Sequence, residues 1–182
     1  SQIGVPLSVI SINEKHNLGI FEAGISTVNE MDRLQKIIQP DIGSLTNIGS
    51  AHDEGFVNLI QKIDEKLLLF KESRIIIYQK DHLVDSCLSQ FSAEYLLDSR
   101  VLFSWSYTDE TADVFILKKE NQEDKTAIQY RYKNEIFDLE IPFRDNASIE
   151  NAVSCLLVLL YLKYDTLTIQ NRMFLLYPVE MR

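Results

Sequence analysis

Residues 41–56 read DIGSLTNIGSAHDEGF, and this stretch decides the fold class of the chain. Segment 41–48 is rich in apolar residues and predicts a buried β-strand, and the small residues after it predict a tight turn that carries His52. On either side, residues 17–25 (NLGIFEAGI) and 73–79 (SRIIIYQ) predict two further strands. Because ligands of open α/β sheets collect at the carboxyl ends of the strands, His52 is expected at a binding edge.

Segments with helical periodicity separate these strands. Apolar residues three and four positions apart predict a helix that ends before Pro40 and a second helix over residues 57–71. A third helix is expected over residues 82–91. The order strand, helix, strand, helix, strand up to residue 79 therefore predicts an α/β fold, a doubly wound and mostly parallel sheet with helices on both faces.

The pattern changes near residue 100. Alternating apolar and polar residues between turn signals predict a small antiparallel meander of four strands, over residues 101–107, 112–119, 126–132 and 136–141. Two helices are expected after it, over residues 147–164 and 166–176. We therefore divide the chain into a parallel α/β part (1–99), the meander (100–143) and C-terminal helices (144–182).

Composition limits the class of protein. With 182 residues, of which 46% are hydrophobic and 25% charged, the chain can bury a full core. Its net charge of -9 argues against a nucleic acid or an anionic membrane as partner, although a local site can still bind a nucleotide. No apolar run reaches membrane length and no signal peptide is visible, so a cytoplasmic location is expected. Cys87 and Cys155 lie in apolar helical contexts and are expected to be buried free thiols.

Glu22 and His52 form a candidate metal site. Glu22 lies inside the apolar strand predicted over residues 17–25, and a buried carboxylate is costly unless it is paired or bound to a metal. A carboxylate and an imidazole at the ends of neighbouring strands are suitable ligands for a divalent cation. A plainer explanation remains open for each residue: Glu22 caps the next helix, and His52 is a structural or surface histidine.

Lys66 is the next candidate. On the helix predicted over residues 57–71 it shares one stripe with apolar residues, namely Leu59, Ile63 and Phe70. Its side chain is therefore expected to point toward the sheet, which is unusual for lysine and suggests a ligand or a modified side chain. The alternative is an ordinary solvated lysine on the helix surface.

Asn151 lies in the first turn of the helix predicted over residues 147–164. Its amide suits a purine edge, although an asparagine at a helix start often makes only local hydrogen bonds. The chain contains no Gly-x-x-x-x-Gly-Lys-[Ser/Thr] phosphate loop and no Gly-x-Gly-x-x-Gly dinucleotide motif. The sequence therefore offers no phosphate-binding loop of its own beside the candidate metal site.

Five segments together resemble a known family. In order and spacing, SQIGVP (1–6), GIFEAGIS (19–26), TNIGSAHDEGF (46–56), IDEKLLLF (63–70) and SIENAV (148–153) are similar to the central ATPase domain of the Mur ligases. The specific part is Asn-Ile-Gly-x-Ala-His-x-x-x-Phe, and the resemblance covers nearly the whole chain. Within the family it is greatest to ligases of UDP-N-acetylmuramoyl-tripeptide and D-alanyl-D-alanine, including forms fused to an alanine racemase. Folylpolyglutamate synthases share the architecture, and a non-catalytic interaction domain is a further alternative.

The resemblance implies an ATP-dependent amide-bond-forming ligase of peptidoglycan precursor synthesis, which acts through an acyl phosphate. Glu22 and His52 match magnesium ligands of the family. Lys66 matches a lysine that several members carbamoylate, which turns an ammonium into a carboxylate-like metal ligand. Asn151 matches the asparagine that contacts adenine, and Arg182 matches an arginine that reaches the nucleotide. ATP and Mg²⁺ are therefore the expected cofactors, with pyridoxal phosphate only if a racemase domain follows.

The resemblance also implies what lies outside the chain. The phosphate loop is expected upstream of Ser1 and the amine-substrate domain downstream of Arg182, so the isolated chain is expected to be inactive. The expected substrates of the full protein are a nucleotide-linked muramoyl peptide and D-alanyl-D-alanine. In one departure from the family, Ala147-Ser148 stand where a His-Asn pair is usual, so the contact with the base is expected to differ.

Overall fold

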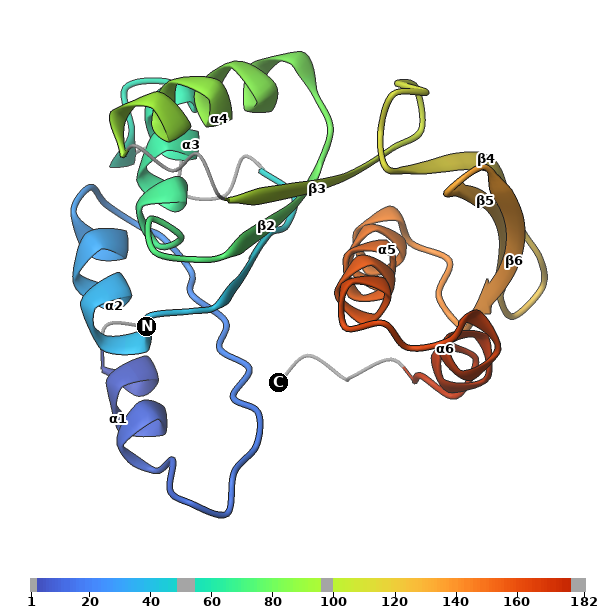
Figure 1. Ribbon diagram of the computed structural model, residues 1–182, viewed down its shortest axis with the longest axis horizontal. Helices are drawn as coiled ribbons and strands as arrows, with labels where there is room; N and C mark the ends of the chain where they lie inside the picture. Colours follow the sequence, from blue (N-terminus) through green and yellow to red (C-terminus); the bar gives the residue numbers. More distant parts are fainter. Residues whose placement is uncertain (1–2, 49–54, 96–99, 178–182) are drawn as a thin grey trace. The chain divides into compact units, whose positions relative to one another are not determined.

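A computed structural model describes residues 3–48, 55–95 and 100–177 (Figure 1). The chain splits into two compact units, each described by itself: Ser1–Ile76 with His82–Val101, and Ile77–Asp81 with Leu102–Arg182. The elements, in chain order, are α1 (Gly4–Ile10), α2 (Glu30–Ile38), β1 (Ile42–Leu45), α3 (Leu59–Leu68), β2 (Ile75–Gln79), α4 (His82–Glu94), β3 (Val101–Ser106), β4 (Val114–Asn121), β5 (Thr126–Tyr132), β6 (Glu135–Ile141), α5 (Asn146–Tyr161) and α6 (Thr166–Met173).

The six strands follow one another in the order β1-β2-β3-β4-β5-β6 in one sheet. Backbone bonds join the starts of the first three strands: Arg74 N–H donates to the Asp41 carbonyl at 2.9 Å, and Val101 N–H donates to the Arg74 carbonyl at 3.0 Å. Strands β1, β2 and β3 therefore start at the same end and run parallel. Helices α2, α3 and α4 alternate with them, which is the α/β pattern that the periodicity of the sequence predicts.

The strand predicted over residues 17–25 is not formed. This segment has no strand assignment, and most of its side chains are exposed, including Leu18 at 68% and Ile20 at 87%. Alternating apolar residues fit any extended segment, whereas a strand also needs a hydrogen-bonding neighbour, which a local pattern does not reveal. The prediction was wrong because the apolar pattern of residues 17–25 does not show whether a neighbouring strand is available to pair with them.

The antiparallel meander is confirmed for three of its four strands. β4 pairs antiparallel with β5, and β5 with β6, but β3 pairs parallel with β4 through Trp105 opposite Val114. Hydrogen bonds within the loop between β3 and β4 hold its shape. There the Ser106 hydroxyl accepts from the Asp109 N–H at 3.0 Å, and the Asp109 carboxylate accepts from the Thr111 N–H at 2.8 Å.

In the first unit, α2 and α3 pack through buried aliphatic side chains: Met31, Leu34, Ile63 and Leu67. The N-cap residue of α2, Asn29, has left-handed backbone dihedrals and makes no side-chain cap. Instead, the Met31 N–H donates to the carboxylate of buried Glu65 at 3.2 Å. A side chain from α3 thus satisfies one of the open N–H groups at the start of α2.

In the second unit, α5 and α6 lie along the inner side of the curved strands β4, β5 and β6 (Figure 1). Helix α5 begins at its N-cap Asp145, whose carboxylate accepts from the Ser148 N–H at 2.8 Å. The core of this unit consists of apolar residues that α5 and the strands bury together, namely Ile149, Val153, Leu156, Leu157, Ile128, Leu139 and Ile141.

Several smaller expectations need correction. Helix α3 is shorter than residues 57–71, and Leu59 is 44% exposed, so only Ile63 and Phe70 of the predicted stripe are buried. Cys87 is buried as expected, but Cys155 is exposed because it faces away from the buried side of α5.

In residues 3–48, 55–95 and 100–177, no helix has the length and apolar character that a membrane crossing requires.

The bond between Glu65 and Met31 yields a stability prediction. Because Glu65→Ala leaves the Met31 N–H without its acceptor, we expect the free energy of unfolding in urea to fall by about 1–3 kcal/mol. Glu65→Gln keeps an acceptor and should lose less. The exposed Glu72→Ala is the matched control, with an expected change within about 0.5 kcal/mol. Equal losses in Glu65→Ala and Glu72→Ala would contradict this role of Glu65.

Candidate functional site

Helix α3 carries Lys66 toward the end of β1. Its N-terminus is fixed by Asn58, whose side chain accepts from the Gln61 N–H at 2.9 Å, while the Gln61 side chain accepts from the Val57 N–H at 2.7 Å. In its last turn, the Lys66 ammonium donates to the backbone carbonyl of Asn47 at 3.3 Å. Asn47 follows β1 by two residues, so the amine lies at the carboxyl end of that strand, where ligands of open α/β sheets collect.

The environment of Lys66 weakens its positive charge. The side chain is half-buried, and burial lowers its pKa below the ordinary value for lysine, with a smaller contribution from the nearby charge of Lys62. A lysine with a lowered pKa is neutral more often near neutral pH, and a neutral amine is the form that reacts as a nucleophile. Lys66 is therefore a candidate nucleophile in the first unit.

Of the other two predicted metal ligands, the structure describes only Glu22. Glu22 is exposed in the irregular segment 17–25, so the expectation that its carboxylate is buried was wrong. His52 lies outside the described residues, as does Arg182. Within the described ranges, no three His, Cys, Asp or Glu side chains come close enough together to hold a metal ion.

Asn151 lies on an exposed face of α5, in the second unit. Because the helix begins at Asn146, Asn151 falls in the second turn and not in the first turn, where we expected it. Among the five predicted residues, the structure describes three, Glu22, Lys66 and Asn151, and the described hydrogen bonds and ion pairs join no two of them.

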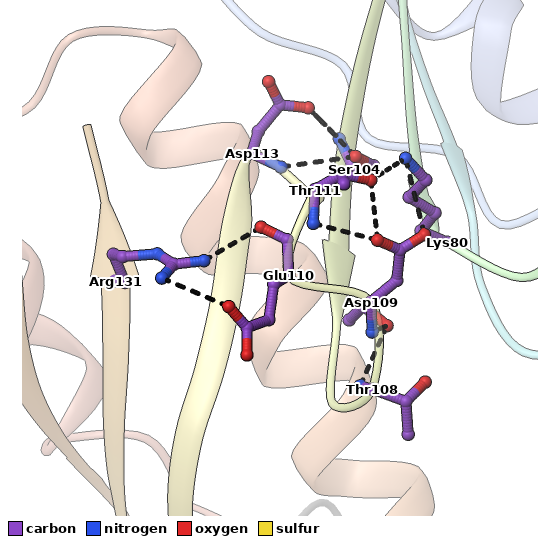
Figure 2. Close-up of polar contacts among 9 residues, drawn as sticks. Lys80, Ser104, Thr108, Asp109, Glu110, Thr111, Asp113 and Arg131 are labelled. Atoms are coloured by element: carbon purple, nitrogen blue, oxygen red, sulfur yellow. Dashed lines mark hydrogen bonds and ion pairs between the residues drawn. The ribbon is translucent and has the colours of Figure 1, made fainter. Parts of the chain in front are cut away.

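A polar cluster that the sequence analysis did not single out lies at the carboxyl ends of β2 and β3 (Figure 2). The Lys80 ammonium donates to the Thr111 hydroxyl at 2.6 Å and lies 3.6 Å from the carboxylate of Asp109. The hydroxyl and N–H of Thr111 both donate to Asp109 and hold the pKa of this carboxyl below its usual range. Only the position of Lys80, directly after an apolar strand, signals this cluster in the sequence.

The loop that carries this cluster is also anchored at its base. The Asp113 carboxylate accepts from the N–H of Ser104 at 2.8 Å and from its hydroxyl at 3.0 Å, and Arg131 donates to the carbonyl of Glu110 at 2.8 Å (Figure 2). These bonds fix the loop between β3 and β4 from both sides. Its polar side chains are therefore held in place beside Lys80.

Comparison with known families identifies the family of the chain. The family model described as "Mur ligase middle domain" matches residues 1–159. The chain belongs to the Mur ligase middle-domain family. One curated relative, the UDP-N-acetylmuramoyl-tripeptide–D-alanyl-D-alanine ligase of Borreliella burgdorferi, is 27% identical over 167 residues. That similarity covers 89% of this chain but 34% of the relative, so the chain spans about a third of the length of the ligase that it matches.

Solved structures agree on the Mur ligase fold. A crystal structure of MurF from Acinetobacter baumannii has a TM-score of 0.82 at 19% identity, and the similarity covers 97% of this chain and 38% of that one. MurF from Thermotoga maritima in complex with ADP has a TM-score of 0.64 at 20% identity, with 85% and 34% covered. The apo form of folylpolyglutamate synthase (FPGS) from L. casei has a TM-score of 0.67 at 13% identity, with 89% and 39% covered. At these identities, the structures establish the shared fold alone.

Proposed function

We propose that the chain is the nucleotide-handling central part of an ATP-dependent ligase that joins D-alanyl-D-alanine to UDP-N-acetylmuramoyl-tripeptide. The observation that carries this proposal is the sequence similarity over 89% of the chain to a ligase described by those two substrates. The position of the Lys66 amine at the carboxyl end of β1 supports it, because this edge of an α/β sheet is where ligands bind. Both substrates and ATP would be bound with the help of protein outside this chain.

The proposed reaction has two steps. A carboxylate oxygen of the tripeptide attacks the γ-phosphorus of ATP, which forms an acyl phosphate and releases ADP. The amine of D-alanyl-D-alanine then attacks the acyl carbon, the phosphate leaves with the bonding electrons, and loss of a proton from nitrogen gives the amide. Because charge builds up on the phosphoryl oxygens in the first step, cationic groups near them are expected to supply much of the catalysis.

Mg²⁺ is the implied metal of this reaction. It takes oxygen ligands, and it would neutralise charge on the phosphates of ATP. The Asn47 carbonyl is an oxygen donor beside Lys66, and Glu22 offers an exposed carboxylate in the same unit. The ammonium of unmodified Lys66 repels a cation. Mg²⁺ therefore fits this site only if a modification gives the Lys66 side chain a negatively charged carboxylate. We propose Glu22, His52 and a modified Lys66 as the magnesium-binding residues.

The proposed modification of Lys66 is a carbamate. Its neutral amine attacks the carbon of CO₂ and loses one proton, which gives N-carboxylysine with a negative charge. The lowered pKa of Lys66 favours this step, because the protonated amine has no lone pair to donate. The product presents two oxygens where an ammonium stood, and in this form Lys66 is suited to hold Mg²⁺ and to act as a catalytic residue beside His52.

Asn151 and Arg182 complete the proposed nucleotide site. The exposed amide of Asn151 has both a donor and an acceptor, which match the two complementary atoms on the edge of adenine. Arg182 would contribute a positive charge to the phosphates.

Fusion to a racemase, with its pyridoxal phosphate, and a cytoplasmic location of the full protein stay predictions of the sequence analysis.

An FPGS-like ligase is the second candidate, because FPGS shares the fold. In the curated relative, however, the similar sequence belongs to a UDP-N-acetylmuramoyl-tripeptide–D-alanyl-D-alanine ligase. A non-catalytic interaction domain is the third. Activity assays of the full-length protein with muramoyl-tripeptide and with folate substrates separate all three candidates, since the interaction domain would turn over neither.

Lys66 provides the first test of the proposed chemistry. In the full-length protein, we expect Lys66→Ala to lower kcat by at least about 100-fold, since the magnesium site loses a ligand. Added acetate or formate should restore part of kcat in Lys66→Ala by filling the vacated position. Lys66→Arg is the matched control, because its side chain fills the space and cannot form a carbamate. Full activity of Lys66→Ala, or equal rescue of both variants, would contradict the proposal.

Asn151 provides the second test. Because Asn151→Ala removes both hydrogen-bonding atoms of the amide, we expect the KM for ATP to rise about tenfold and the preference for ATP over GTP to shrink. Steady-state kinetics of the full-length protein with both nucleotides measure this. The matched control is Asn171→Ala, an exposed asparagine on α6, which should leave both constants unchanged. An unchanged KM in Asn151→Ala would remove Asn151 from the site.

A further inference from the structure

The segment that leads from β6 into α5 is held by the hairpin between β4 and β5. Thr126, the first residue of β5, is fully buried, and its hydroxyl lies 2.6 Å from the carbonyl of Phe143 and 3.0 Å from the side-chain oxygen of Asn121. Since a hydroxyl has one proton, it donates to one acceptor at a time, and the shorter contact identifies Phe143 as the main one. This bond ties the hairpin to the chain just before α5.

Three weaker contacts reinforce the bond from Thr126. The side-chain amide of Asn121 donates to the carbonyl of Arg144 at 3.3 Å, and Arg144 donates back to the carbonyl of Glu123 at 3.1 Å. The Lys119 ammonium donates to the side-chain oxygen of Asn146 at 3.0 Å. We name this set, Thr126 with Asn121, Lys119 and Arg144, the hairpin clamp. Thr126, Asn121 and Lys119 each donate to a residue within 143–146, and Arg144 donates from that segment back to the hairpin.

The clamp fixes the part of α5 from which Asn151 projects. Asp145 caps the helix directly after the clamped carbonyls, and Asn146, its first residue, is already engaged by Lys119. In the first two turns of α5, Asn151 is the other residue with a side-chain amide. Ala147, which lies between them, has no polar side-chain group. Because a helix moves as a rigid element, a shift of residues 143–146 displaces the Asn151 amide by a similar distance.

We infer that Thr126 is a positioning residue for the recognition of the nucleotide base, which it serves by fixing the start of α5 and so the place of Asn151. This inference rests on the proposed function of Asn151. Base recognition needs donor and acceptor within a few tenths of an ångström of their best distance, so loss of the clamp should weaken ATP binding without slowing the chemical step.

The test compares four forms of the full-length protein by steady-state kinetics with ATP and GTP. Thr126→Val keeps the shape of the side chain and removes the hydroxyl, and Thr126→Ser keeps the hydroxyl. Ser73→Ala is the matched control, because the Ser73 hydroxyl is also buried and donates to a backbone carbonyl, that of Pro40, at 2.7 Å in the first unit. We expect Thr126→Val to raise the KM for ATP by about fivefold and to keep kcat within about twofold of the wild-type value. The preference for ATP over GTP should shrink in this variant. Thr126→Ser and Ser73→Ala should keep the wild-type KM for ATP.

Two outcomes overturn the inference. The first is an unchanged KM in Thr126→Val while Asn151→Ala raises it, which would leave the function of Asn151 intact and remove only Thr126. The second is an equal rise of KM in Ser73→Ala, which would mean that general destabilisation is the cause. If Asn151→Ala itself has no effect, the proposed function fails instead. Should Thr126→Val not fold, Asn121→Ala removes a more exposed bond of the same clamp and should raise the KM for ATP by about twofold.

Discussion

The hydrogen bond from the Met31 N–H to the buried carboxylate of Glu65 is the constraint on which the first unit depends. A buried carboxylate is stable where N–H groups and the positive end of a helix face it, and α2 provides both. With Glu65 held, the rotation of α3 about its axis is set. The next residue along the helix, Lys66, is rotated by about 100° from Glu65 and donates to the Asn47 carbonyl after the end of β1. One structural contact thereby orients the side chain on which the proposed chemistry depends.

In the second unit, a different set of contacts orients the helix that carries Asn151. There, the hairpin between β4 and β5 supplies hydroxyl, amide and ammonium donors to the segment that leads into this helix, α5. Backbone carbonyls accept most of these bonds. Placement of a functional side chain by a remote scaffold is the usual arrangement at binding sites, because the binding residues themselves must stay available to the ligand.

The sequence predicted those features that depend on local periodicity. Helices α2 to α5 and strands β4 to β6 follow from apolar spacing, and so does the direction of Lys66, since Ile63 and Phe70 of its stripe are buried. Sheet pairing depends on distant neighbours, and there the sequence misled: residues 17–25 form no strand, and β3 runs parallel to β4. The partners of Thr126 and Lys80 could not be predicted from the sequence, because they are a backbone carbonyl and a loop hydroxyl far along the chain.

Direct detection of a carbamate on Lys66 is the sharpest test of the account. The full-length protein would be equilibrated with carbon-13-labelled bicarbonate and Mg²⁺ and examined by carbon-13 NMR, beside the Lys66→Arg variant. We predict a carbamate carbon resonance in the wild-type protein that is missing from Lys66→Arg and that shifts when Mg²⁺ is removed. The absence of this resonance from the wild-type protein, or its persistence in Lys66→Arg, would contradict the assignment of Lys66 as a metal ligand.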